Sequence, residues 1–208
     1  MTSDVFASGI VAVLRADSVA ACVPALRVLL DAGIPDIELT MTIPGLLDDL
    51  AELVEALPEA SLGVGTVTRS DEVRRAVASG ARFIVSPAVV PDVMDASRDA
   101  GVSVFPGALT PTEILRAARL GATAVKLFPA ATVGPGYLGH LRGPLPDVRL
   151  LPSGGIALED ISAWLRAGAT AVSLGGPLLG DALEGGSLRA LAARAHAARA
   201  AVESVRAA

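Results

Sequence analysis

The segment TAVKLFP, residues 123–129, is a short apolar run interrupted by one charged residue, and runs of this kind recur along the whole chain. Nearly continuous runs of valine, isoleucine and leucine are typical of strands that are buried on both faces. The eight strand candidates are IVAVLR (10–15), DIELTM (36–41), SLGVGTV (61–67), RFIVSP (82–87), SVFPGA (103–108), TAVKLFP (123–129), VRLLPSGG (148–155) and TAVSLGG (170–176).

Longer amphipathic segments separate these runs, for example residues 18–33 and 71–81. Several segments end in a glycine, which is the usual stop of a helix before the next strand. The stop glycines are Gly33, Gly80, Gly101, Gly121 and Gly168. Residues 187–207 predict a closing helix, and the glycines and prolines between Thr132 and Pro146 predict a short sixth helix.

Eight strand–helix units in 208 residues, without a linker, predict an α/β fold: a single-domain (β/α)8 TIM barrel over residues 1–208. A doubly wound open sheet is the alternative. It is disfavoured because no GxGxxG motif follows the first strand and because the units number eight. A composition of 52% hydrophobic and 19% charged residues suits a buried sheet covered by helices and excludes a disordered chain.

Charge and composition exclude several classes of partner. The net charge is -5 and no basic stretch could follow a phosphate backbone, so we expect no nucleic-acid partner. Cys22 is the single cysteine, which excludes a disulfide framework and a thiolate metal cluster. The N-terminal segment lacks the features of a secretory signal, and no apolar run reaches the roughly 18 residues that cross a bilayer. We therefore expect a cytoplasmic protein without membrane contact.

Three charged residues interrupt the apolar strands: Arg15, Glu38 and Lys126. Because side chains alternate along a strand, Glu38 faces the opposite side from Ile37, and Lys126 the opposite side from Val125. If the apolar side chains face the helices, both charges point into the barrel. Active sites of such barrels lie at the C-terminal ends of the strands.

Lys126 is the only lysine beside sixteen arginines. A buried structural ion pair with Glu38 is one interpretation, but arginine would serve that purpose at least as well. Lysine has a property that arginine lacks: a buried amine readily becomes neutral, because burial disfavours its charged form. A neutral amine attacks a ketone to form an iminium, and a nearby carboxylate can move the protons that bond cleavage requires. This chemistry requires no metal and no nicotinamide cofactor.

Two glycine-rich turns predict the position of a bound anion. Pro-Ser-Gly-Gly-Ile (152–156) ends the seventh strand and Leu-Gly-Gly (174–176) ends the eighth. Phosphate binding by these two loops is a common barrel arrangement. Thr66, at the end of the third strand, is expected to offer a hydroxyl to the substrate. His140 and His196 are expected on the surface and not at a metal site.

The chain resembles, over essentially its full length, the bacterial aldolases that act on 2-keto-3-deoxy-6-phosphogluconate and 4-hydroxy-2-oxoglutarate. The matching stretches are IVAVLRADS, IELTMTIPG, GVGTVT, FIVSPAVV, FPGALTPTEI, VKLFPA, VGPGYLGHLRGPLPDVRLLPSGGI and the final Leu-Gly-Gly. The resemblance implies a cofactor-free class I aldolase, built as a homotrimer of barrels, that acts on a 2-keto acid. It implies cleavage to pyruvate and an aldehyde, either glyceraldehyde 3-phosphate or glyoxylate.

The resemblance also assigns roles to individual residues. It places the Schiff-base lysine on Lys126 and the proton-shuttling glutamate on Glu38. The residues implied to contact substrate are Arg15, Thr66, Pro87, Phe128, Ser153, Gly154, Gly155, Gly175 and Gly176. The chain departs from the common family pattern at four positions, Thr42, Ala131, Ser153 and Gly176. Gly176 replaces a serine and removes one hydroxyl, so we expect weaker contacts at the distal end of the substrate.

Two other classes of function are compatible with parts of the pattern. A phosphate-binding barrel isomerase or epimerase would share the two glycine-rich turns, but its activity would not depend on Lys126. A non-catalytic ligand-binding barrel would gain little from an amine placed beside a carboxylate inside the barrel.

Overall fold

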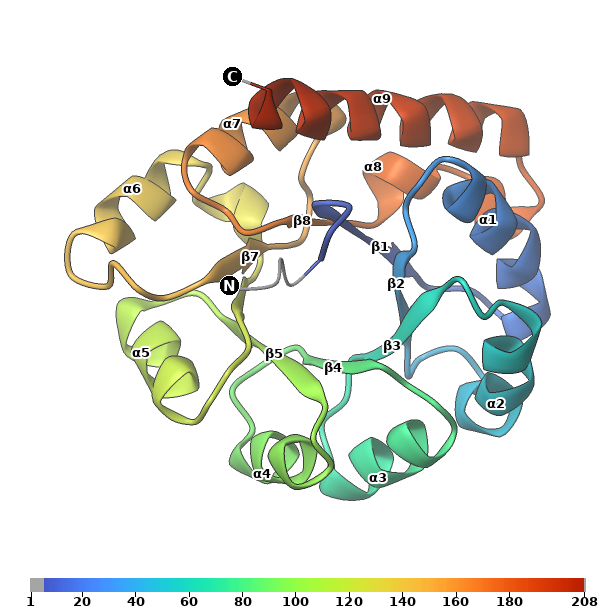
Figure 1. Ribbon diagram of the computed structural model, residues 1–208, viewed down its shortest axis with the longest axis horizontal. Helices are drawn as coiled ribbons and strands as arrows, with labels where there is room; N and C mark the ends of the chain where they lie inside the picture. The colour runs from blue at the N-terminus through green and yellow to red at the C-terminus, as the bar shows by residue number, and fades with distance from the viewer. Residues whose placement is uncertain (1–5, 208) are drawn as a thin grey trace.

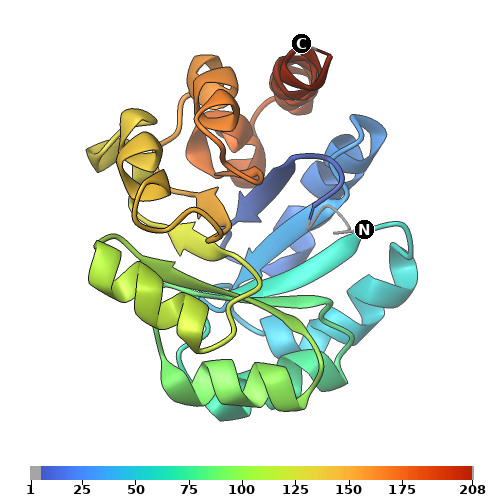
Figure 2. The same ribbon diagram turned by 60° about the vertical axis from the view of Figure 1, so that its left-hand side comes forward.

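The structure is a computed structural model that describes residues 6–207 (Figure 1). The first five residues of the segment searched for a secretory signal, and the predicted domain limits at residues 1 and 208, lie outside the described residues. Strands form the centre of the molecule, and helices form a ring around them. Figure 2 shows the same arrangement in an oblique view, with the helices outside the strands.

Eight parallel strands form a nearly closed barrel, which confirms the TIM-barrel prediction. The strands are β1 Ile10–Leu14, β2 Asp36–Thr40, β3 Ser61–Gly65, β4 Phe83–Ser86, β5 Ser103–Ala108, β6 Val125–Leu127, β7 Leu150–Pro152 and β8 Val172–Leu174. Neighbours in sequence pair from β1 to β7, and β8 pairs with β1. A parallel bridge between Ser153 and Ser173 joins the remaining gap between β7 and β8.

All eight predicted strands are present, but several are shorter than expected. The seventh strand ends at Pro152 instead of residue 155. Gly154 and Gly155 have φ values of 93° and 75°, and such left-handed backbone cannot continue a strand. The chain therefore leaves the barrel at Ser153, which places the glycine-rich turn at the C-terminal mouth of the barrel.

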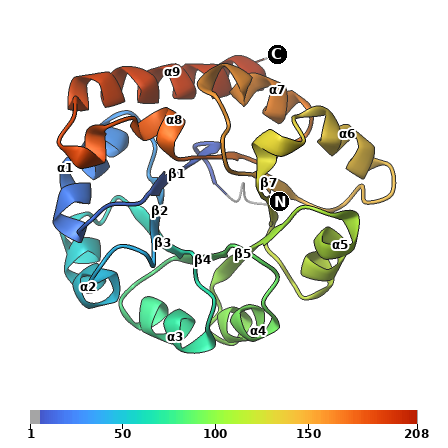
Figure 3. The same cartoon turned by 180° about the vertical axis from the view of Figure 1, so that it is seen from behind.

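The helices follow the strands in alternation. They are α1 Val19–Asp31, α2 Leu46–Ala56, α3 Ser70–Ala78, α4 Pro91–Asp99, α5 Pro111–Arg119, α6 Gly136–Arg142, α7 Ile161–Arg166, α8 Gly176–Leu179 and α9 Leu188–Arg206. The sixth helix is short, as predicted, and α9 is the expected closing helix. It lies across α1, α7 and α8 (Figures 1 and 3). No helix in residues 6–207 combines the length and the apolarity needed to cross a membrane.

A serine cap, which was not predicted, begins α1, and the predicted stop glycine follows its end. Ser18 caps α1, because its side chain accepts a hydrogen bond from the Ala21 N–H at 3.2 Å. Gly33 follows the same helix with a φ of 76°, a conformation that favours glycine. Cys22 is buried on α1, and burial raises the pKa of its thiol to about 11. The thiol therefore stays protonated at neutral pH and acts as a small apolar core residue.

A cluster of apolar side chains fills the interior of the barrel toward the N-terminal ends of the strands. Phe6, Phe83 and Phe105 form its aromatic part, with ring centroids 4.9–5.9 Å apart. The remaining members are Val11, Val85, Ala124, Leu151 and Ala171. The barrel is therefore a packed core and not a pore, and the charged residues lie above it at the C-terminal mouth.

Replacing Phe105 tests how much this inner cluster stabilises the fold. Phe105 is fully buried, so Phe105→Ala leaves a cavity and is expected to lower the free energy of unfolding by about 3–5 kcal/mol. Urea denaturation of the wild type and the variant measures this difference. Phe128→Ala is the matched control, because Phe128 is 39% exposed, and its loss should be less than half as large. Equal losses at the two positions would contradict the packed interior.

Candidate active site

A cavity of about 250 Å³ opens at the C-terminal ends of the strands. It contains all eleven residues that the sequence predicts for the site, contributed by the ends of seven strands. These residues are Arg15, Glu38, Thr66, Pro87, Lys126, Phe128, Ser153, Gly154, Gly155, Gly175 and Gly176. Val13 and Pro177 complete the lining and were not predicted. The size suits a small organic molecule.

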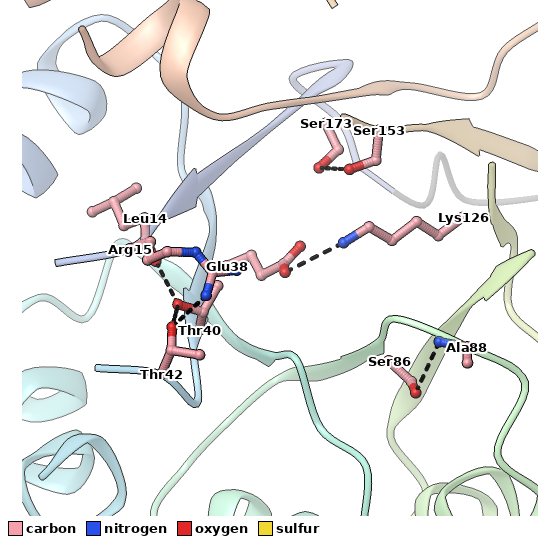
Figure 4. A network of polar contacts seen from close by, with 10 residues as sticks. All are labelled: Leu14, Arg15, Glu38, Thr40, Thr42, Ser86, Ala88, Lys126, Ser153 and Ser173. Carbon is pink, nitrogen blue, oxygen red and sulfur yellow. Dashed lines mark hydrogen bonds and ion pairs between the residues drawn. The ribbon is translucent and has the colours of Figure 1, made fainter. Parts of the chain in front are cut away.

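Lys126 and Glu38 face each other across the inside of the barrel (Figure 4). Lys126 Nζ lies 3.5 Å from Glu38 Oε1, and the two side chains are only 10% and 2% exposed. A closed ammonium–carboxylate hydrogen bond is typically about 2.7–2.9 Å long. The two groups therefore form a long ion pair, and both lie within reach of a small molecule in the cavity.

Glycines on β3 make the space that Glu38 occupies. A Cβ atom at Gly65 would lie 2.0 Å from Glu38 Oε1, and one at Gly63 would lie 2.2 Å from the Phe83 ring. Both distances are far below van der Waals contact, so neither position accepts a side chain. Gly63 pairs in register with Glu38, which brings the bare backbone of β3 beside the carboxylate. The lack of a side chain at Gly65 thus leaves the space that the Glu38 carboxylate occupies.

Phe128 covers the lysine from the mouth of the cavity. Lys126 Nζ lies 5.5 Å from the centroid of the Phe128 ring, within the range of a cation–π contact. The same ring lies against Gly154, where an added Cβ atom would approach it to 2.9 Å. Phe128 therefore joins the amine on β6 to the glycine-rich turn after β7.

Thr66 is held in a strained backbone conformation. Its φ of 62° is the one positive value of a non-glycine residue in the described part of the chain. A β-branched residue in this region is an outlier, and such strain persists only where neighbouring contacts fix the backbone. Here Gly65 C=O accepts from the Met41 N–H at 2.8 Å, and the Val67 N–H donates to Val85 C=O at 3.1 Å. These two bonds hold Thr66 at the cavity wall.

Arg15 is oriented by a chain of hydrogen bonds at the ends of β1 and β2. Its Nη1 donates to Thr42 Oγ1 at 2.6 Å, and Thr42 Oγ1 lies 2.8 Å from Thr40 Oγ1. Thr40 Oγ1 in turn donates to Leu14 C=O at 3.2 Å. Figure 4 shows these residues grouped at the ends of β1 and β2. Thr42 thus stands beside Arg15 and accepts a hydrogen bond from its guanidinium.

The loop after β7 is attached to the loop after β6 and to β8. The Ser153 hydroxyl donates to the Ser173 hydroxyl at 3.2 Å, and both side chains are buried. The Ala130 N–H donates to Ser153 C=O at 2.8 Å, and the Ala131 N–H donates to Gly154 C=O at 3.0 Å. These bonds fix the glycine-rich turn relative to Lys126. Ser173 was not predicted, although alternation along β8 with Gly175 could have indicated its inward direction.

The two histidines are exposed and lie apart from the cavity, His140 on α6 and His196 on α9. Within residues 6–207, no group of three or more histidine, cysteine, aspartate or glutamate side chains has an arrangement that could hold a metal ion.

The family model described as "KDPG and KHG aldolase" matches residues 2–191.

The chain belongs to the KDPG and KHG aldolase family. A 2-dehydro-3-deoxy-phosphogluconate aldolase of Pseudoalteromonas atlantica is 33% identical over 166 residues, which cover 79% of this chain and 77% of the relative. A 2-dehydro-3-deoxy-6-phosphogalactonate aldolase of Escherichia coli K12 is 30% identical over 171 residues, or 81% and 83% of the two chains.

A solved structure connects the family to covalent chemistry. The KDPG aldolase of Legionella pneumophila is 25% identical and superimposes with a TM-score of 0.85, covering 92% of this chain and 94% of that one. In that structure pyruvate is captured as a covalent carbinolamine intermediate. The family consists of class I aldolases, which are carbon–carbon lyases. The chain is therefore an enzyme of this class, and neither an isomerase nor a non-catalytic barrel.

The space at Gly65 provides a test of the Glu38 position in this aldolase. Gly65→Ala places a methyl group 2.0 Å from the native carboxylate oxygen, so Glu38 must move. We expect kcat for aldol cleavage to fall about 100-fold or more, as is typical when a positioned acid–base group is lost. Steady-state kinetics measure the change, and circular dichroism checks that the barrel is retained.

Gly139→Ala is the matched control, because an added methyl group on α6 meets no atom within 4 Å. Its kcat should stay within about twofold of the wild type, since helices prefer alanine to glycine. A folded Gly65→Ala variant with unchanged kcat would contradict the dependence of activity on this position of Glu38.

Proposed function

We propose that this aldolase cleaves a 4-hydroxy-2-keto acid through a Schiff base on Lys126, with Glu38 as the proton-transfer group. The favoured substrates are 2-keto-3-deoxy-6-phosphogluconate and 4-hydroxy-2-oxoglutarate. The products would be pyruvate with glyceraldehyde 3-phosphate in the first case, and pyruvate with glyoxylate in the second. The observation that carries the proposal is the buried, loosely paired amine and carboxylate, 3.5 Å apart, in the wall of the cavity.

The reaction begins with the amine of Lys126. Its nitrogen attacks carbon 2 of the substrate, and loss of water from the carbinolamine leaves an iminium. Glu38 removes the proton of the hydroxyl on carbon 4, and the bond between carbons 3 and 4 breaks. The aldehyde leaves, while the bonding electrons move into the iminium and form an enamine. Protonation of carbon 3 and hydrolysis then release pyruvate and restore the free amine.

The other residues of the cavity are proposed to position the substrate. Thr66 lies near the carboxylate end, with Pro87 and Phe128 as the walls around the three carbons of the pyruvate moiety. Ser153 and the glycines after β7 and β8 contact the distal end. Arg15 supplies a positive charge at the wall formed by the ends of β1 and β2. No cofactor takes part in this sequence of steps.

Three properties of the whole protein remain predictions. We propose that residues 1–208 form one catalytic domain, in keeping with the match to the family model over residues 2–191. The homotrimer, which rests on the family resemblance, and the cytoplasmic location are likewise proposals.

Trapping the intermediate tests the role of Lys126. Incubation with pyruvate and borohydride should add one reduced pyruvate to the protein, because borohydride reduces the iminium to a stable amine. Peptide mapping should locate the adduct on Lys126, the only lysine of the chain. Lys126→Arg should form no adduct and lose activity, since a guanidinium stays charged and is not a nucleophile.

The control for this experiment combines Lys126→Arg with Arg82→Lys, which places a single lysine at an exposed position. This variant should also remain unlabelled, because an exposed amine is largely protonated at neutral pH. Unchanged mass of the wild-type protein after treatment would refute the Schiff base, and labelling of the control would show that the adduct is unspecific.

Parallel kinetics on two substrates test the assignment of the substrate. We expect cleavage of both 2-keto-3-deoxy-6-phosphogluconate and 4-hydroxy-2-oxoglutarate, because both present the same 2-keto and 4-hydroxyl groups to Lys126 and Glu38. Gly176 stands where the common family pattern has a serine. Compared with an enzyme that has this serine, the affinity for the distal end of the substrate should be about 2- to 12-fold weaker, the effect of one neutral hydrogen bond. Coupled detection of pyruvate measures kcat/KM for each. Absence of cleavage of both substrates would refute the assignment.

A further inference from the structure

Arg15 is the only cation besides Lys126 among the residues that line the cavity. In the proposed function, on which this inference rests, the amine of Lys126 is consumed in the covalent bond. Arg15 then supplies the one guanidinium available to an anionic group of the substrate. Its side chain is long and exposed, and such a side chain samples many rotamers unless it is held.

The hydrogen bonds beside Arg15 have only one possible direction. A carbonyl oxygen can only accept, so the single hydroxyl proton of Thr40 is directed to Leu14 C=O. Thr40 Oγ1 must then accept from Thr42, which uses the single proton of Thr42. The lone pairs of Thr42 Oγ1 are left to accept from Arg15 Nη1, which lies 2.6 Å away.

This series of hydrogen bonds begins in the buried interior of the barrel and ends at an exposed side chain. Thr40 is 1% exposed on β2, and Leu14 is fully buried on the neighbouring strand β1. Thr42 and Arg15 are both exposed at the mouth of the cavity. A buried carbonyl of the barrel therefore determines, through two hydroxyls, where an exposed guanidinium is held.

We propose that Thr40 and Thr42 are positioning residues that hold Arg15 toward the distal end of the substrate. The order of the strands supports a position of the Arg15 guanidinium near the distal end of the substrate. Lys126 lies on β6, whereas Arg15 follows β1, which pairs with β8. A Cβ atom at Gly175 would lie 3.8 Å from Val13 C=O, so the loop after β8 lies against the end of β1. In the view of Figure 4, the Glu38 side chain lies between Arg15 and Lys126.

The test compares Thr42→Val with Thr42→Ser. Valine keeps the shape of threonine and removes the acceptor for Arg15, whereas serine keeps the hydroxyl. For the phosphorylated six-carbon substrate we expect Thr42→Val to raise KM about 3- to 10-fold with kcat within about twofold, as for the loss of one hydrogen bond. The KM of Thr42→Ser should stay within about twofold of the wild-type value. Thr112→Val, at an exposed position at the start of α5, is the control and should change neither value.

A second measurement separates positioning from general damage. The pyruvate concentration that gives half-maximal borohydride trapping should stay within about twofold in Thr42→Val, because pyruvate has no distal end. In an Arg15→Met background, Thr42→Val should cause no further rise in KM, since its effect acts through Arg15. Thr40→Val should raise KM in the same direction as Thr42→Val.

The outcomes distinguish this inference from the proposed function. Normal trapping of pyruvate together with an unchanged KM in Thr42→Val would overturn the positioning role and leave the Schiff base intact. Equal weakening of pyruvate trapping, or an additive effect in the Arg15→Met background, would also overturn it. If the wild-type protein forms no adduct with pyruvate, the proposed function fails and the positioning role fails with it.

Discussion

Two side chains of opposite charge share the C-terminal interior of the barrel, where water reaches neither of them freely. Burying an ionisable group costs several kcal/mol unless a partner compensates for the lost hydration. Lys126 and Glu38 compensate each other only in part, since their 3.5 Å separation is longer than a closed ion pair. Other features of the site follow from this constraint: Gly65 gives the carboxylate its space, and the Phe128 ring shields the amine.

The barrel interior has two levels, one on each side of the buried charged pair. Below the charged pair, the aromatic cluster around Phe105 excludes water and gives Glu38 and Lys126 a rigid floor. Above it, the strand ends pass into loops that need unusual backbone, such as Thr66 at a φ of 62° and Gly154 at 93°. Rigid strands thus hold the groups proposed for the chemistry, whereas the loops hold the groups proposed for substrate contact.

Much of this arrangement could be predicted from the sequence, because it depends on local periodicity. Period-two alternation indicated that Glu38 and Lys126 point inward, and the scarcity of lysine singled out Lys126. The role of Gly65 could not be predicted, because it depends on the register that pairs Gly63 with Glu38. The direction of the hydrogen bonds from Arg15 to Leu14 C=O likewise requires the spatial positions of two adjacent strands. The early end of β7 was missed because positive φ values at Gly154 and Gly155 are a property of the folded turn.

The distal end of the cavity differs in kind from the end at Lys126. The loop after β8 offers few strong donors, because Gly176 has no side chain and Pro177 has no backbone N–H. Serine and backbone groups provide neutral hydrogen bonds there, and each of these contributes only about 0.5–1.5 kcal/mol. Hydrogen bonds that involve a charged group are roughly twice as strong, so the guanidinium of Arg15 counts for more than any single neutral donor of that wall. The contribution of such a charge depends on where it is held, which gives the hydroxyls of Thr40 and Thr42 an influence on substrate affinity without contact to the substrate.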